Sequence, residues 1–239
     1  MGPLFGRCLA HEVGPVLEMI DAPCLLEFGA GSGALAQSLI EALSVSGQLP
    51  PRYCIPEISP DLRERQRKRL EPLAKGFGLT IEWLEQIPSE PLRGVILANE
   101  VVDAFAVTRF RVIEDRPWRA GVCIEGDGFA WDWIDDLAPD SVAAKIVRRY
   151  GLAEGYTSEV CPRADAWIDT LGHCLEQGLA IVIDYGFPAG EYYLPERSQG
   201  TLRCHYQHRA HNDPLIFAGI QDITCHVDFS ALADAGRAV

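Results

Sequence analysis

A glycine-rich turn limits the possible folds of this chain more than any other feature of its sequence. Residues 24–35, "CLLEFGAGSGAL", place an apolar run before three glycines, and a helical pattern of leucines starts at Leu35. A buried strand that turns through glycines into a helix is typical of sheets in which strands and helices alternate. The turn fits the G-x-G-x-x-A pattern of dinucleotide sites and the G-x-G-x-G pattern of methyltransferases. On its own it could equally be a plain tight turn.

The rest of the chain continues this alternation. Further apolar runs occur at residues 52–57, 79–84, 94–98 and 179–186. The stretch between the last two runs includes residues 164–178, which have helical spacing and a glycine at the end, so we expect a helix there. Unbroken apolar strands between helices predict a mostly parallel sheet with both faces covered.

Residues 107–160 depart from that rhythm. Their short, partly alternating runs lie between turn sequences such as "EDRP" and "GDG", which predicts an antiparallel meander inserted after the fourth strand. We therefore divide the chain into residues 1–106, the cofactor-binding half of a Rossmann-like domain, residues 107–160, a β-rich insertion, and residues 161–239. This last part returns to the Rossmann-like domain and adds the loops on the substrate side.

Composition excludes several classes of protein. Acidic residues outnumber basic ones by 34 to 21, for a net charge of -13, which argues against a nucleic-acid partner. No run approaches the roughly 18 apolar residues of a membrane span. The eight cysteines are scattered without a C-x-x-C pair, so we expect reduced thiols and a cytoplasmic location.

Two acids decide between the cofactors that suit the glycine turn. Glu27 lies in the strand just before Gly29, where a pyrophosphate would gain nothing from another negative charge. S-adenosylmethionine has no phosphate and carries an ammonium and a sulfonium, which a carboxylate favours. Glu57 ends the second strand, the place where both cofactor classes use an acid for ribose hydroxyls. We predict that the cofactor-binding residues are Glu27, Gly29, Gly31, Gly33, Glu57 and Asn99.

A second polar cluster follows the fourth strand in "LANEVVDAF". Asn99, Glu100 and Asp103 come where an open α/β sheet presents its ligand crevice. A spacing of three would put the two acids on one side of a helical turn. The simpler alternative is a helix start with acids that favour its dipole, which accounts for one acid better than for two acids and an amide. We predict that Asn99, Glu100 and Asp103 are the catalytic residues.

Six segments, in order, carry a family resemblance: "LLEFGAGSGAL", "YCIPEISPDLRERQ", "ILANEVVDAF", "IVIDYG", "GTLRCHYQHRAH" and "GIQDITCHVDFSAL". In this order they resemble the MidA-like class I methyltransferases, whose mitochondrial members are complex I assembly arginine methyltransferases. The resemblance implies an α/β, Rossmann-like sheet of seven strands and S-adenosyl-L-methionine as cofactor. The chain resembles a fragment of the family pattern truncated at both ends. It also has Ala30 and Ser32 where the family loop has proline and arginine.

The resemblance implies a protein arginine N-methyltransferase that acts on a respiratory-complex or other protein partner with an accessible arginine. A homodimer is possible. We assign substrate contacts to Glu159, Asp184, Tyr185 and His208. His208 belongs to "HYQHRAH", whose three histidines suggest zinc, but no cysteine or acid completes a tetrahedral set, so we predict no metal. Two alternatives stay open, a non-catalytic assembly factor that keeps the fold and an NAD-dependent oxidoreductase.

Overall fold

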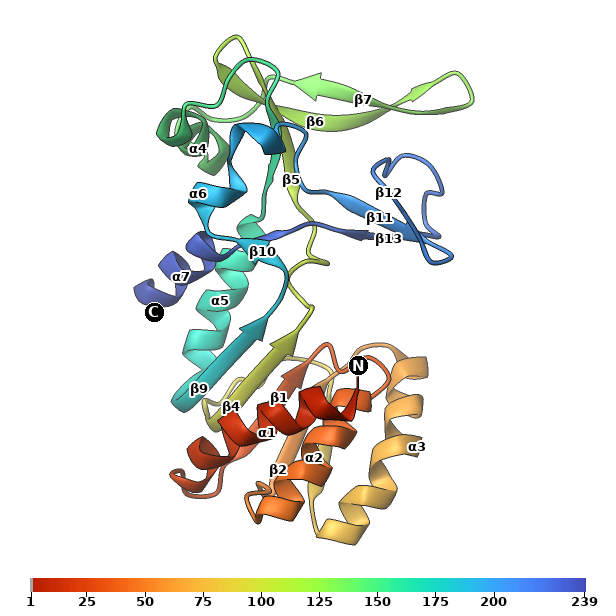
Figure 1. Cartoon of the computed structure of the whole chain (residues 1–239), viewed down its shortest axis with the longest axis vertical. Helices are drawn as coiled ribbons and strands as arrows, with labels where there is room; N and C mark the ends of the chain where they lie inside the picture. The colour runs from red at the N-terminus through yellow and green to blue at the C-terminus, as the bar shows by residue number, and fades with distance from the viewer. Residues whose placement is uncertain (1) are drawn as a thin grey trace. The chain divides into compact units, whose positions relative to one another are not determined.

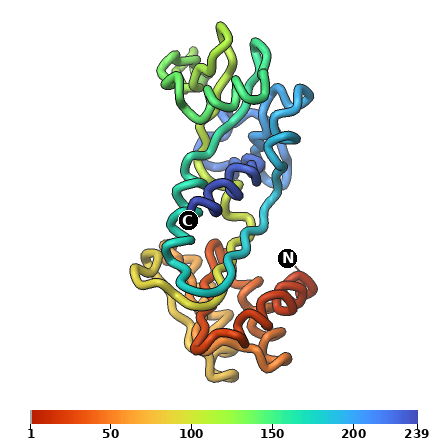
Figure 2. Tube along the Cα trace, turned by 90° about the vertical axis from the view of Figure 1, so that its left-hand side faces the viewer, coloured from red at the N-terminus to blue at the C-terminus, as the bar shows by residue number. Residues whose placement is uncertain are grey.

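The computed structural model describes residues 2–239, which divide into two units. Unit 1 contains the chain up to Val101, residues 170–183 and Val239, and unit 2 contains residues 102–169 and 184–238. The chain leaves unit 1 after residue 101, returns at residue 170 and leaves again at residue 184. Figure 2 shows its course, coloured from red at the N-terminus to blue at the C-terminus. The three-part division expected from the sequence stays a prediction.

Unit 1 is built on a parallel sheet (Figure 1). Its five strands are β1 (Cys24–Phe28), β2 (Arg52–Pro56), β3 (Thr80–Leu84), β4 (Leu92–Asn99) and β9 (Leu175–Ile183). Their order is β3-β2-β1-β4-β9, and every neighbouring pair is parallel. β1 is buried along its whole length, as its unbroken apolar sequence predicts.

Three helices build the core of unit 1 with this sheet: α1 (Pro3–Glu18), α2 (Ala34–Ser46) and α3 (Pro60–Phe77). α3 begins where the sequence signals it, because the Ser59 side chain accepts a hydrogen bond from the Leu62 amide and Pro60 occupies the first turn. It ends at Gly78, which has the left-handed conformation of a helix C-terminus. Apolar side chains of these helices form one cluster with buried residues of β1, β2 and β4.

The helix expected over residues 164–178 is too long. α5 (Pro162–Cys174) stops four residues earlier, and β9 starts at Leu175. Gly178 lies within this strand at a φ of 140°, and a Cβ there would fall 1.7 Å from the carbonyl oxygen of Gly94. The glycine is therefore needed where two strand backbones approach each other, and it is not a helix stop.

Unit 2 contains the predicted antiparallel sheet. The meander consists of β5 (Thr108–Ile113), β6 (Arg116–Glu125) and β7 (Gly128–Ile134), and after α4 (Val142–Tyr150) comes β8 (Thr157–Val160). The order is β7-β6-β5-β8 with antiparallel pairing throughout. Phe110 and Val112 of β5 are fully buried and share a core cluster with α4. The α/β class with a mostly parallel sheet and an antiparallel addition is confirmed, whereas the parallel sheet formed by the described residues has five strands where the resemblance implied seven.

The rest of unit 2 consists of short elements. They are β10 (Gly186–Phe187), α6 (Ala189–Tyr192), the 3-10 helix η1 (Pro195–Arg197), β11 (Arg203–Tyr206), β12 (Arg209–His211), β13 (Asp222–Thr224), β14 (Val227–Asp228) and α7 (Phe229–Ala238). β12, β11 and β13 form an antiparallel sheet, and β10 pairs with β14 in parallel. Within residues 2–239, none of the helices has both the length and the apolar character to span a bilayer.

Candidate cofactor site and a buried acidic pocket

The candidate cofactor site lies at the carboxyl ends of β1, β2 and β4 in unit 1. From β1 the chain builds the sheet outward in one direction through β2 and β3, and β4 lies on the other side of β1. Such a reversal opens a crevice at the carboxyl edge of a parallel sheet. Phe28 pairs with Ala98, so the glycine loop and Asn99 begin at the same level of that edge.

The loop needs its glycines for their backbone conformation. Gly29, Gly31 and Gly33 have φ angles of 65°, 52° and 75°, a left-handed region that disfavours other residues. A Cβ at Gly31 would meet only the Gly29 oxygen, 3.9 Å away, so the space beside this backbone is open. Gly33 is the N-cap of α2. Open backbone leading into a helix N-terminus suits a ligand that lies against the main chain.

Glu57 is held in place by its neighbours at the end of β2. One carboxylate oxygen accepts a hydrogen bond from the Ser59 amide at 2.8 Å, and the other accepts one from the Gln66 side chain at 3.1 Å. The carboxylate is thus fixed while half-exposed, and its remaining lone pairs are available to accept ligand hydroxyls.

Gln66 is a site residue that the sequence analysis missed. It is fully buried on α3, donates to the Gly31 carbonyl at 2.8 Å, and accepts from the Trp83 indole at 3.0 Å. One side chain therefore ties the glycine loop to Glu57 and to β3. The only sequence signal was an uncharged residue within "RERQRKR", four positions before the buried Leu70.

Glu27 lies in the core of the sheet. It is 2% exposed and accepts a 2.7 Å hydrogen bond from the Tyr53 hydroxyl of β2. Burial raises the pKa of Glu27 from 4.5 to about 7, and the Tyr53 hydrogen bond opposes that rise. Its direct contact with a cofactor stays a prediction, but it places a titrating carboxyl two residues before the glycine loop.

The end of β4 has an unusual backbone. Residues 100–105 form turns and bends, so the expected helical turn is wrong. Glu100 has a φ of 50°, an uncommon conformation for a residue other than glycine, and its amide donates to the Ile183 carbonyl of β9 at 2.8 Å. Its side chain is exposed, whereas Asn99 is 9% exposed. Backbone strain of this kind often marks a functional position.

Asp103 and Asp184 belong to unit 2 and organise a turn there. One oxygen of Asp184 accepts hydrogen bonds from the amides of Val102 and Asp103, at 3.0 and 3.1 Å, and the other accepts from the Tyr185 amide. Asp103 is 4% exposed, and Tyr185 is 47% exposed. Both carboxylate oxygens of Asp184 therefore accept hydrogen bonds from backbone amides, which gives this residue a structural role.

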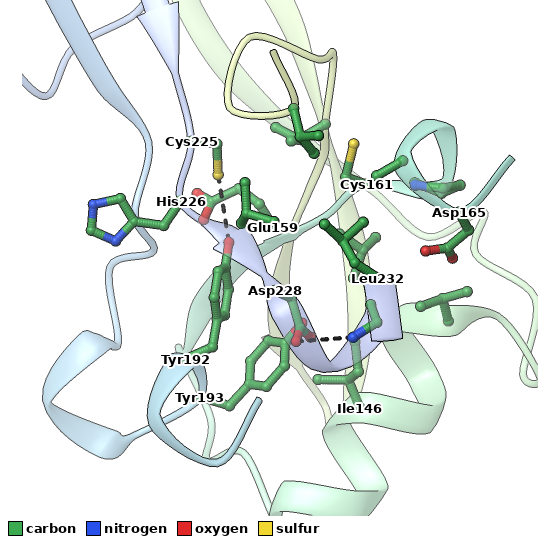
Figure 3. Close-up of a pocket in the computed structure, with 18 residues that line it drawn as sticks. Ile146, Glu159, Cys161, Asp165, Tyr192, Tyr193, Cys225, His226, Asp228 and Leu232 are labelled. Atoms are coloured by element: carbon green, nitrogen blue, oxygen red, sulfur yellow. Dashed lines mark hydrogen bonds between the residues drawn. The ribbon is translucent and has the colours of Figure 1, made fainter. Parts of the chain in front are cut away.

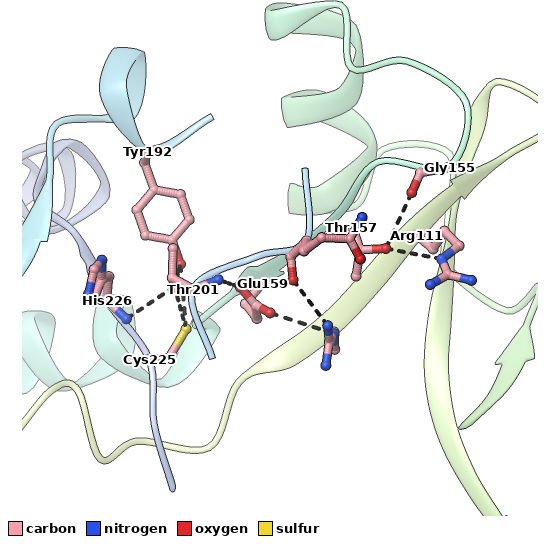
Figure 4. Close-up of polar contacts among 10 residues, drawn as sticks. Arg111, Gly155, Thr157, Glu159, Tyr192, Thr201, Cys225 and His226 are labelled. Carbon is pink, nitrogen blue, oxygen red and sulfur yellow. Dashed lines mark hydrogen bonds and ion pairs between the residues drawn. The ribbon is translucent and has the colours of Figure 1, made fainter. Parts of the chain in front are cut away.

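Glu159 of β8 is a second buried acid of unit 2, besides Asp103 (Figure 4). Its side chain is fully buried, one oxygen accepts from the Thr201 amide at 2.9 Å, and the other lies 3.6 Å from Nε of Arg109. Burial raises the pKa of Glu159, and the Thr201 amide and Arg109 oppose this rise. Gly200 has a φ of 78°, and a Cβ there would fall 2.2 Å from the glutamate, so only glycine permits this approach.

Glu159 lines an enclosed, mainly apolar pocket of about 50 Å³ in unit 2 (Figure 3). In the close-up the Tyr192 hydroxyl points toward Cys225, and the two atoms lie 3.5 Å apart. Burial raises the pKa of the Cys225 thiol to about 12 and, near Glu159, the pKa of Tyr192 well above its usual value. These groups stay protonated at neutral pH, so the pocket offers neutral donors beside the carboxyls of Glu159, Asp165 and Asp228.

His208, assigned to the substrate mouth from the sequence, lies in a hairpin turn. It is exposed at the tip of the β11–β12 hairpin, where Gln207 and His208 have φ angles of 46° and 64°, as a two-residue hairpin turn requires. Its contact with substrate stays a prediction. No group of three or more potential metal ligands occurs among residues 2–239.

The family model described as "Putative S-adenosyl-L-methionine-dependent methyltransferase" matches residues 8–239. The chain belongs to this family. The family resemblance predicted from the sequence is thereby confirmed, and the predicted cofactor is the one that the family description names. No protein of curated function matches the sequence significantly.

Two solved structures from Burkholderia thailandensis resemble this family member over 99% of its length. One, a "likely methyl transferase" bound to S-adenosyl-homocysteine, has 39% sequence identity and a TM-score of 0.91. The other, a protein of the same superfamily solved in its native form, has 40% identity and a TM-score of 0.88. The chain spans 61% and 63% of the lengths of these proteins.

The sequence analysis compared the chain with a fragment of the family pattern. The family model matches residues 8–239, which is nearly all of the sequence. The predicted site residues keep the status given above, because family membership does not assign roles to individual side chains. The cytoplasmic location also stays a prediction.

Proposed function

We propose that this protein transfers a methyl group from S-adenosylmethionine to an arginine side chain of a protein partner. The observation that carries the proposal is the glycine loop of unit 1, whose open, left-handed backbone lies at the same sheet edge as the fixed carboxylate of Glu57. Membership of the methyltransferase family supports the same conclusion. The arginine substrate rests on the MidA-like resemblance.

The residues of unit 1 fit this cofactor. Gly31 leaves room for the methionine part against the main chain, and Glu57 can accept hydrogen bonds from ribose hydroxyls. The dinucleotide alternative gains no support, since the buried carboxyl of Glu27 precedes the loop where a pyrophosphate would lie. When bound, S-adenosylmethionine supplies an electrophilic methyl group, whose bond to sulfur breaks as the bond to nitrogen forms.

Glu100 is our candidate for the acid that receives the substrate. Its carboxylate is exposed directly after the carboxyl end of β4, on a strained backbone that the β9 hydrogen bond holds. A carboxylate can bind a guanidinium through two parallel hydrogen bonds and orient its free nitrogen toward the methyl group. The proton on that nitrogen can pass to the carboxylate or to water after the new bond has formed. Asp103 and Glu159 are further candidates.

The test is to map methylated arginines across the proteins of the native cell, with and without the gene. We expect specific sites to disappear with the gene, to return with the wild-type protein, and to stay absent with Glu100→Gln. Loss of one such contact lowers the transfer rate about 100-fold or more. Glu64→Gln, on the exposed surface of α3, is the matched control and should restore methylation.

Two results would contradict the proposal. If the methylarginine map did not change with the gene, arginine would not be the substrate. If Glu100→Gln fully restored the methylated sites, Glu100 would have no role in the mechanism. If the purified protein binds S-adenosylmethionine and yet methylates no partner in any map, the non-catalytic assembly factor becomes the better account.

A further inference from the structure

A cleft of unit 2 that no step of the proposed methyl transfer uses gathers positive charge. It has a volume of about 620 Å³ and is lined by Arg109, Arg197 and Arg203 together with His226 and Asn212. The chain as a whole has a net charge of -13. Three guanidinium groups around one concavity are therefore a local exception that calls for a physical reason.

Neutral neighbours hold Arg197 and Arg203. Arg197 stacks over the Phe187 ring at 3.7 Å and donates from Nε to the Glu191 carbonyl at 2.9 Å. Arg203 donates to the Asn212 side chain at 2.6 Å. Within residues 2–239, neither of these arginines forms an ion pair with a carboxylate. Their side chains are oriented in advance, but their charge is not neutralised.

Arg109 has one acidic neighbour. It stacks over Trp131, with the guanidinium carbon 5.1 Å from the ring centre, and donates to the Gln199 carbonyl at 3.1 Å. Its Nε lies 3.6 Å from the Glu159 carboxyl, and that contact is too long for a hydrogen bond. Glu159 thus faces only Arg109, and the lining of the cleft contains three arginines and no acidic residue, which leaves the cleft positive.

His226 adds an unused polar atom to this cleft. Its ring packs on Phe187 with the ring centres 5.2 Å apart, and its buried Nδ1 has no hydrogen-bond partner. Burial and then the charges of Arg197 and Arg203 lower the pKa of His226, while Asp184 acts in the opposite direction. The imidazole is therefore neutral in the free protein at neutral pH, and a nearby anion would favour its protonation.

We propose that this cleft binds an oxyanion, a phosphate or carboxylate group that the guanidinium forks of Arg197 and Arg203 hold. Guanidinium matches the geometry of these anions with parallel hydrogen bonds. Stacking and carbonyl contacts fix the orientation of the arginines before binding, which lowers the entropy lost when an anion binds. The proposal concerns a site separate from the glycine loop and does not depend on methyl transfer.

Isothermal titration calorimetry with inorganic phosphate on the whole chain tests the site. Arg197→Gln and Arg203→Gln should each weaken phosphate binding about tenfold, because each removes a charge-assisted contact. Arg237→Gln is the matched control, since this exposed arginine of α7 pairs with Asp234 and loses the same charge. Arg203→Lys keeps the charge without the fork and should bind with intermediate affinity. Thermal melts show which variants fold.

Nuclear magnetic resonance gives a second readout that does not require a variant. Phosphate should raise the pKa of His226 and leave the ring resonances of the exposed His208 unchanged. Phosphoserine and an oligoglutamate peptide then distinguish a phosphate ligand from a carboxylate ligand, and preference for either supports the site. The proposal would be overturned if Arg197→Gln and Arg203→Gln bound phosphate with the affinity of the wild type and of Arg237→Gln. It would also be overturned if the pKa of His226 did not respond to phosphate.

Discussion

Replacing Glu27 by glutamine should change how the stability of unit 1 depends on pH. Burial raises the pKa of Glu27 from 4.5 to about 7, so the folded state binds the proton more tightly than the unfolded state. A raised pKa gives stability that is complete below 4.5 and is lost as the pH rises through 7. At about 1.4 kcal/mol per pKa unit, the full loss is about 3 kcal/mol.

About 2 kcal/mol of this loss in the free energy of unfolding falls between about pH 5.5 and pH 8.5. This range lies above the isoelectric point of the chain, which is about 4.8. We expect the free energy of unfolding of the wild type, relative to Glu27→Gln, to fall by that amount across the range. Urea unfolding measures it, and hydrogen exchange of the β1 amides assigns it to unit 1. The difference between the two proteins cancels other titrating groups such as Glu159.

Tyr53→Phe is the control for the cause of this effect. The Tyr53 hydroxyl donates to Glu27 at 2.7 Å and lowers its pKa. Its removal should therefore move the pH transition upward in the protein that has Glu27. In the Glu27→Gln protein, the same change should leave the pH dependence of stability unaltered. Parallel stability curves for wild type and Glu27→Gln between pH 5.5 and 8.5 would refute the reasoning. Parallel curves would mean that water reaches the Glu27 carboxyl, or that another group stabilises its ionised form.

Three further predictions test the fold and the site. Gly94→Ala should destabilise unit 1 by more than about 4 kcal/mol in thermal melts, since its Cβ would lie 1.9 Å from a β1 carbonyl oxygen. As a control, Gly76→Ala has open space in α3 and should stabilise the unit by up to about 1 kcal/mol. Gln66→Leu should weaken binding of S-adenosyl-homocysteine in calorimetry, because it leaves the loop carbonyl without its donor; unchanged affinity would remove this contact from the site. Gly200→Ala should lower the melting temperature of unit 2 more than Gly155→Ala, which has a similar φ but no close neighbour; equal losses would show that the approach to the buried glutamate adds no constraint.

The sequence predicted those parts of the fold that follow from local pattern. The glycine loop after β1 and the meander from β5 to β7 come from residues close together in the chain, and both were predicted. The end of α5 was wrong because Gly178 looks like a helix stop, whereas its role depends on Gly94 of a neighbouring strand. Contacts between distant strands leave no local trace in the sequence.

The candidate site shows the same limit. Glu57 could be predicted from its place at the end of a strand, but Gln66 could not, because the charges around it indicate a solvated helix face. Its burial results from the stripe that it forms with Leu70 and Ala74 on α3. The surroundings of Glu159 depend on Thr201, 42 residues away, so no local pattern could predict them.

Calorimetric titration with S-adenosyl-homocysteine tests the central claim, a cofactor site at the glycine loop of unit 1, most directly. We expect one molecule to bind per chain, Glu57→Gln to weaken binding by about tenfold, and Gly31→Val to abolish it because valine fills the open space beside the loop. An excess of NAD should not compete. Displacement by NAD, or equal affinity of wild type and Gly31→Val in folded protein, would contradict the account.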